Sequence, residues 1–210
     1  ANTMRNKRGL ICIAMGLALI LSAAGLAGYN VVDERHAGEN AERAYEQLLA
    51  EAVAPGETQL PEFVLPAYQI DPRVEMPEIE IDGHSYIGYI SIPSLEIDLP
   101  VMSELTMPNM KIAPCRYYGS IYLNNMVIGA HNYVQHFGRL SSVALGDLVR
   151  FTDVQGNAFD YTVADLEQLD PGQTRELVLA SDYDLTLFTC TVSGMQRFAV
   201  RCVRVEDGPV

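Results

Sequence analysis

The pattern of hydrophobic and polar positions begins with a long uncharged run. Gly9 to Gly28 spans 20 residues without a charge, and at about 1.5 Å per helical residue this matches the hydrocarbon core of a bilayer. Arg5, Lys7 and Arg8 precede the run, so the positive-inside rule leaves the amino terminus in the cytoplasm and everything after Tyr29 outside. We expect a single-pass anchor in the cell membrane with an extracellular body, and the alternative is a cleaved signal peptide.

The next stretch has the hydrophobic period of a helix. From Asp33 to Ala54 the composition favours a helix, and apolar side chains recur at three- and four-residue steps along one face. These side chains are Ala41, Ala44, Tyr45, Leu48 and Leu49. The pattern predicts an amphipathic helix whose apolar face packs on the body of the protein.

Prolines follow this helix. Five of the eleven prolines lie between Pro55 and Pro77, which excludes a regular helix and favours an extended segment. The simplest interpretation of this segment is a spacer between the amphipathic helix and the body.

From Tyr86 onward the chain reads as short strands separated by turn signals. The predicted strands are Tyr86–Ile92, Ile97–Val101, Met126–Ala130, Leu148–Thr152, Ala158–Leu169, Asp184–Cys190 and Arg197–Val205, and Gly138–Leu145 is a candidate short helix. Many short strands with little helix between them predict a mainly β fold, a closed antiparallel barrel.

Two chemically useful residues lie at the ends of the last two predicted strands. Cys190 ends one strand and Arg197 begins the next, so a hairpin would hold the thiol near the guanidinium. Alternation puts Cys190 on one face with Thr186, and Arg197 on one face with Arg201. A thiolate that attacks a carbonyl beside a fixed cation suits acyl transfer, because the cation stabilises the developing oxyanion.

This stretch resembles the active-site signature of the sortases, Thr-Leu-x-Thr-Cys followed by an arginine. Thr186, Leu187, Thr189 and Cys190 match the signature letter for letter, and Arg197 takes the arginine position. The family's upstream histidine motif resembles Val127–Asn132, and its entry strand resembles Gly88–Pro93. The resemblance covers roughly 86–205.

The resemblance implies an eight-stranded sortase barrel and a role for three residues. Cys190 would be the nucleophile, His131 the general acid and base, and Arg197 the group that stabilises the oxyanion or the substrate. Thr189 and Asn132 are candidate substrate contacts that belong to the same motifs.

Two residues compete with these assignments. His136 rivals His131 by spacing alone, and the family pattern selects His131 because it follows small residues and precedes Asn132. Arg201 lies on the same strand face as Arg197, and we prefer Arg197 because it is nearer to the hairpin and therefore to Cys190. Arg201 is kept as a candidate substrate contact.

The reaction that the resemblance implies is transpeptidation at the cell surface of a Gram-positive bacterium. The partners would be a surface protein or pilin with a C-terminal Leu-Pro-x-Thr-Gly-like sorting signal, and an amine from a peptidoglycan precursor or a pilin lysine. A thioester on Cys190 would join the two half-reactions. No cofactor is implied.

Some pilus-assembling members of the family carry a lid, an Asp-Pro-aromatic segment that covers the active site. Asp71 and Pro72 match it, but Arg73 stands where the aromatic residue should be, so we favour the spacer. The expected organisation is a cytoplasmic tip and membrane anchor at 1–28, an amphipathic helix at 29–54, a proline-rich spacer or lid at 55–83 and a catalytic barrel at 84–210.

Composition removes several other classes of function. The net charge of -13 and the absence of tryptophan argue against nucleic acid, which needs a basic surface and stacking platforms. Cys115 and Cys202 are the only pair left for a disulfide once Cys190 is the nucleophile and Cys12 lies in the anchor, and we expect no obligatory disulfide. No cysteine or histidine spacing suits zinc.

Two further hypotheses belong to other classes. A cysteine hydrolase that releases its acyl-enzyme to water would use the same residues. A non-enzymatic, membrane-tethered binding module would hold Cys190 as a buried core thiol. Formation of an amide product with an added amine separates the hydrolase from a transpeptidase. Trapping of the Cys190 thiol with a methanethiosulfonate reagent would weaken the hypothesis of a binding module.

Overall fold

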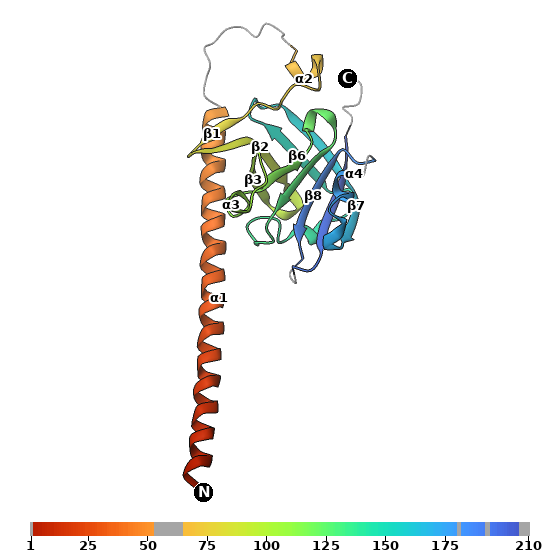
Figure 1. The fold of residues 1–210 in the computed structure, drawn as a ribbon. Helices are drawn as coiled ribbons and strands as arrows, with labels where there is room; N and C mark the ends of the chain where they lie inside the picture. Colours follow the sequence, from red (N-terminus) through yellow and green to blue (C-terminus); the bar gives the residue numbers. More distant parts are fainter. Residues whose placement is uncertain (1, 53–64, 180–181, 192–193, 206–210) are drawn as a thin grey trace. The chain divides into compact units, whose positions relative to one another are not determined.

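A computed structural model describes residues 2–52, 65–179, 182–191 and 194–205, with side chains from residue 11 onward. The contacts divide the chain into two compact units, Ala1–His36 and Ala37–Val210. The second unit holds the barrel and all the candidate site residues (Figure 1).

One helix, α1, runs from Asn2 to Ala52 and contains both the uncharged run and the amphipathic stretch, which the sequence had suggested as separate helices. The helix has the length and apolar composition of a membrane span. In the second unit Ala41 joins the main core, and Ala44 and Leu48 join a second cluster with buried residues of the first four strands. The predicted packing of this apolar face on the body is therefore confirmed, while residues 53 and 54 lie outside the described residues.

Nine strands form one sheet in the order β1-β2-β3-β4-β5-β8-β9-β7-β6, and β6 pairs with β2 to close the barrel. The prediction of a mainly β, closed eight-stranded barrel is confirmed, with β1 added outside the closed ring beside β2. The strands are β1 Ile79–Ile81, β2 His84–Ile92, β3 Ile97–Met102, β4 Cys115–Tyr118, β5 Met126–Ala130, β6 Leu148–Asp153, β7 Ala158–Leu169, β8 Leu185–Cys190 and β9 Arg197–Arg204.

The prediction of a purely antiparallel barrel is wrong at two pairs. β3 pairs with β4 and β5 pairs with β8 in parallel. Parallel neighbours need a long crossover, and here residues 103–114 connect β3 to β4 while β6 and β7 lie between β5 and β8 in the chain. The parallel β5–β8 pair brings the carboxyl ends of both strands to the same edge of the sheet.

Short helices connect the strands. They are α2 Ala67–Ile70, η1 Pro93–Leu95, α3 Met107–Met110, η2 Ile121–Leu123, η3 Leu140–Ser142, η4 Pro171–Gln173 and α4 Glu176–Leu179. The candidate helix at Gly138–Leu145 is only the single turn η3. The chain there is held by turn hydrogen bonds from Leu140 to Phe137 and from Ser142 to Arg139.

The proline-rich segment is described from Leu65 onward, and 55–64 lies outside the described residues. Pro66 begins the one-turn helix α2, so the segment is not wholly extended. Tyr68 stacks on Tyr122 with ring centroids 4.7 Å apart and meets Phe159 edge-on at 5.3 Å. Met76 is buried in the main core. These contacts fix the segment to the single turn at Ile121–Leu123 that precedes β5 and to the start of β7.

Candidate active site

The parallel strands β5 and β8 place two candidate residues side by side. Ala130, the last residue of β5, is the register partner of Thr189, so His131 and Cys190 are the next residues on neighbouring strands. The Thr189 hydroxyl donates a hydrogen bond of 3.0 Å to the Ala130 carbonyl. Thr189 is thus a cross-strand tie, and its side chain is buried at 4% exposure.

The loops that follow the two strands are also tied together. The Asn132 side-chain amide donates to the Thr191 carbonyl at 3.4 Å. Asn132 follows His131 and Thr191 follows Cys190, so this bond joins the loop after β5 to the loop after β8. The amide of Phe137 donates to the His131 carbonyl at 3.2 Å. These bonds fix the backbone that carries His131.

Arg197 lies directly across the hairpin from Cys190. The two are register partners in the antiparallel β8–β9 pair, and opposite residues in such a pair have Cβ atoms about 5 Å apart on the same face. The turn between them is closed by a hydrogen bond from the Thr191 amide to the Gln196 carbonyl at 2.9 Å. Cys190, Arg197 and His131 are all half-buried, as suits groups that meet a substrate.

Arg201 lies in the same pair of strands, β8 and β9, but four residues farther from the hairpin turn than Arg197. Its register partner is Thr186, four residues before Cys190, a separation of about 13 Å along a strand. Its side chain is 1% exposed, and its guanidinium binds Glu167 and Thr186 and two backbone carbonyls. The structure therefore brings Arg197, and not Arg201, to Cys190.

A close contact between strands shapes the surface beside the three residues. Gly129 is the register partner of Phe188, and a Cβ on Gly129 would lie 2.5 Å from the Phe188 ring and 2.8 Å from Leu105. The Phe188 ring also meets the Tyr117 ring edge-on, with centroids 5.5 Å apart. The sequence did not predict this contact. A glycine within a strand, Gly129, was the signal that could have indicated it.

A cavity of about 260 Å³ lies on the same face, at the other ends of β5 and β8. Val127 and Thr186 line it, and each lies four residues before a candidate catalytic residue. The remaining lining residues are Tyr118, Leu123, Asn124, Asn125, Met126, Leu177, Val178 and Tyr183.

His136 is completely buried, as expected for a residue used in packing. Burial lowers its pKa to about 4, because a charged imidazole is poorly solvated there, and nearby His131 acts in the same direction. The carbonyls of Ala37 and Ile112 act in the opposite direction but are outweighed. The Tyr133 ring lies between the two histidines, 4.9 Å from His131 and 5.4 Å from His136.

The other cysteines of the barrel are buried. Burial raises the pKa of both Cys115 and Cys202 to about 12, so neither is a nucleophile near neutral pH. Cys115 belongs to the cluster under α1, and Cys202 to the barrel core. Both pack as small apolar residues.

The candidate lid residue Asp71 faces its own segment. Its carboxylate accepts from Arg73 Nε at 3.3 Å, and both side chains are largely exposed. Within the described residues no three histidine, cysteine or acidic side chains are grouped as metal ligands.

The arrangement can support acyl transfer. A half-buried thiol lies beside an imidazole at one strand end and opposite a guanidinium across a hairpin. Acyl transfer needs a nucleophile, a proton carrier and an oxyanion donor, and a thiol, an imidazole and a guanidinium are groups that can serve in this way.

Comparison with known proteins points to one family. The model of the Sortase domain matches residues 90–205. Sortase A of Bacillus anthracis is 26% identical over 121 residues, which are 55% of this chain and 57% of that protein. The chain thus covers little more than half the length of this curated relative.

Solved structures of sortases share the fold. Sortase C1 of Streptococcus suis is 25% identical, with a TM-score of 0.53 over 60% of this chain and 75% of that one. Sortase A of Corynebacterium diphtheriae is 21% identical, with a TM-score of 0.54 over 90% of this chain and 97% of that one.

Proposed function

Because the chain belongs to the sortase family, we propose that it is a membrane-anchored cysteine transpeptidase of the cell surface. The observation that carries this proposal is the position of Cys190, opposite Arg197 and beside the strand that leads into His131. The substrate is a surface protein or pilin with a Leu-Pro-x-Thr-Gly-like sorting signal, which the enzyme joins to an amine.

The first half-reaction forms a thioester. The Cys190 thiolate attacks the threonine carbonyl of the sorting signal, and the negative charge that develops on the carbonyl oxygen is stabilised by Arg197. Protonated His131 then gives its proton to the leaving amine of the glycine, and the carbon–nitrogen bond breaks. The acyl group stays on Cys190.

The second half-reaction reverses these roles. An amine attacks the thioester, His131 takes the proton from the amine, and the Cys190 thiolate leaves. The amine comes from a peptidoglycan precursor or from a pilin lysine. Asn132 and Thr189 hold the geometry through their hydrogen bonds between the two strand ends.

The helix α1 supports a cellular placement at the membrane. Its apolar part is exposed and is long enough to span a membrane. The basic residues before it favour a cytoplasmic amino terminus. The barrel then faces outward, where the sorting signals of exported proteins are presented.

The experiment is cleavage of a sorting peptide by the full chain in detergent, with and without an added amine. We expect an amide product that depends on the amine, and its loss by at least about a thousandfold in both Cys190→Ala and His131→Ala. Thermal melts of the two variants should stay close to wild type, because both side chains are half-buried. Release of free acid at the same rate with and without amine would identify a hydrolase instead, and activity retained in Cys190→Ala would end the proposal.

A further inference from the structure

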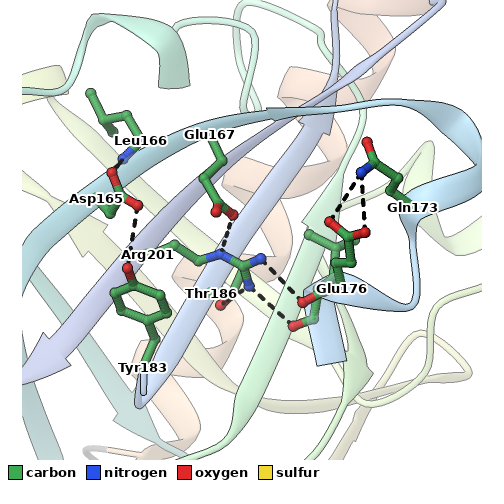
Figure 2. A network of polar contacts seen from close by, with 9 residues as sticks. Asp165, Leu166, Glu167, Gln173, Glu176, Tyr183, Thr186 and Arg201 are labelled. Carbon is green, nitrogen blue, oxygen red and sulfur yellow. Dashed lines mark hydrogen bonds and ion pairs between the residues drawn. The ribbon is translucent and has the colours of Figure 1, made fainter. Parts of the chain in front are cut away.

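Arg201 lies on the same face of the sheet as Cys190, where its side chain is buried, and each nitrogen of its guanidinium donates a hydrogen bond (Figure 2). Its Nε donates to Glu167 at 2.8 Å, and its Nη1 donates to the Thr186 hydroxyl at 3.1 Å and the Leu177 carbonyl at 3.2 Å. Its Nη2 donates to the Glu176 carbonyl at 3.2 Å. One side chain of β9 therefore binds β7, β8 and α4.

The helix α4 depends on this arginine. It has four residues, Glu176–Leu179, so its carbonyls have few partners within the helix. A guanidinium is a planar fork of charged donors and can bind two successive carbonyls, whereas an ammonium is a single point of charge. Arg201 thus fastens α4 to the outer face of the sheet.

The position of α4 shapes the cavity on the face of the proposed active site. Leu177 is 2% exposed and packs in a cluster with Val127, Phe188 and Ala199. Leu177 and Thr186, which both bind Arg201, also line the cavity of about 260 Å³. The wall of this cavity is therefore built on the hydrogen bonds of Arg201.

A second chain of hydrogen bonds leads from α4 to the catalytic hairpin. The Glu176 carboxylate accepts from Gln173 Nε2 at 3.1 and 3.2 Å, and Gln173 Oε1 accepts from the Asp170 amide at 2.9 Å. The Asp170 carboxylate accepts from Gln196 Nε2 at 3.3 Å. Gln196 directly precedes Arg197, so the α4 region is connected to the turn that carries the proposed oxyanion donor.

We propose that Arg201 is a positioning residue that fixes α4 against β8 and so builds one wall of the cleft that receives the extended peptide substrate. The identity of the substrate rests on the proposed transpeptidase function. The positioning role rests on the hydrogen bonds of Arg201. Arg201 does not touch the reacting atoms, and its charge is compensated by Glu167. Its loss weakens substrate binding and leaves the thiol chemistry intact.

The test compares Arg201→Met and Arg201→Lys with wild type, using the full chain in detergent. We expect KM for a sorting peptide to rise about tenfold in Arg201→Met while kcat changes less than about threefold. The rate at which a small methanethiosulfonate modifies Cys190 should be the same in Arg201→Met as in wild type. Arg201→Lys should recover little of the loss, because an ammonium does not reproduce the fork.

Hydrogen exchange gives a readout that does not need activity. In Arg201→Met the amides of Val178 and Leu179, which bond to the Arg175 carbonyl, should exchange at least about tenfold faster, since α4 loses its attachment. Val149→Ala, at a buried core position in β6 away from α4, is the control for general loss of stability. It should lower the melting temperature without changing KM or the exchange of α4.

The outcomes separate the two proposals. If Arg201→Met changes neither α4 exchange nor KM more than Val149→Ala does, the positioning role is wrong. If wild type cleaves no sorting peptide, the proposed function fails, and the exchange measurement still decides whether Arg201 fixes α4. Should Arg201→Met not fold, Thr186→Val removes one acceptor of the same network, and the hydrogen exchange of α4 alone decides, because Thr186 itself lines the cavity.

Discussion

Cys190 and Arg197 are register partners across the β8–β9 hairpin. They lie seven positions apart in the chain, and alternation within each strand turns both side chains to the outer face of the barrel. The turn hydrogen bonds between Thr191 and Gln196 close the hairpin, and further bonds tie Thr191 to Asn132 and Gln196 to Asp170. A change in the hairpin turn would therefore act directly on the distance between thiol and guanidinium.

The first prediction concerns the charge and shape of Arg197. Arg197→Gln should lower kcat about 100- to 1,000-fold with little change in KM, because an oxyanion donor acts mainly in the transition state. Arg197→Lys keeps the charge and should recover part of the loss. Steady-state kinetics with a sorting peptide measure both. A pattern in which Arg197→Gln changes only KM, while Arg201→Met lowers kcat, would reverse the roles that we assign to the two arginines.

The second prediction concerns Gly129, whose missing side chain leaves room for Phe188. Gly129→Ala places a methyl group 2.5 Å from the ring of Phe188, so the ring must move and the fold should lose about 1–3 kcal/mol. Because Phe188 is two residues from Cys190, cleavage should also slow. Chemical denaturation and peptide cleavage measure the two effects.

The control for this change is Gly172→Ala. A Cβ at Gly172 meets nothing within 4 Å, so its stability and activity should remain those of wild type. Equal behaviour of the two alanine variants would show that the Phe188 ring yields without cost.

Runs of strand-forming residues predicted the β8–β9 hairpin almost to the residue. β8 and β9 begin and end within one residue of the predicted bounds, because each is a run of strand-forming residues and a turn separates them. β1 and β4 were not predicted, since three and four residues are too few to show a period. The parallel pairing of β5 and β8 was also not predictable, because alternation is the same in parallel and antiparallel strands.

The two arginines show a different limit of the sequence. Alternation correctly put Arg197 and Arg201 on one face of β9, but the pattern holds no information on what covers that face. Only the fold shows that α4 lies over Arg201 and takes up its donors. Long-range contacts of this kind depend on the β7–β8 connection, whose own sequence from 170 to 184 has no clear period.

The third prediction concerns pH and His136. Its pKa falls from 6.5 in the unfolded chain to about 4 in the fold, so between these values the unfolded chain binds a proton that the folded chain does not. Stability is therefore complete above pH 6.5 and falls as the pH is lowered toward 4, by about 3 kcal/mol from this group. Denaturation midpoints across this range measure the slope.

His136→Phe keeps a ring of similar volume without a proton site. The variant should lose a large part of the slope between pH 6.5 and 4, whereas Val149→Ala should be less stable at every pH with the slope of wild type. An unchanged slope in His136→Phe would mean that other groups cause the acid sensitivity.

The fourth prediction concerns topology. If α1 is a retained anchor with its basic end in the cytoplasm, protease added to intact cells with an accessible outer surface should digest the barrel, and an untreated barrel should sediment with membranes. A tag at the amino terminus should be cut only after lysis, which serves as the control. A barrel that resists protease until lysis, or that is released into the medium, would contradict this topology.

The last prediction concerns the proline-rich segment and access to Cys190. Tyr68 stacks on Tyr122, which precedes β5, while His131 follows the other end of that strand. Asp71 pairs with Arg73, and their side chains are 58% and 85% exposed, so the pair contributes about 0–1 kcal/mol. We therefore expect Asp71→Ala to change the rate of Cys190 alkylation less than tenfold, a factor that equals about 1.4 kcal/mol.

Tyr68→Ala should lower the melting temperature, because the ring contacts hold the segment, and should likewise change the rate of Cys190 alkylation less than tenfold. Alkylation with a small thiol reagent on wild type and both variants decides the question, and an acceleration of about a hundredfold in Asp71→Ala, some 2.7 kcal/mol, would show that the segment acts as a lid over Cys190.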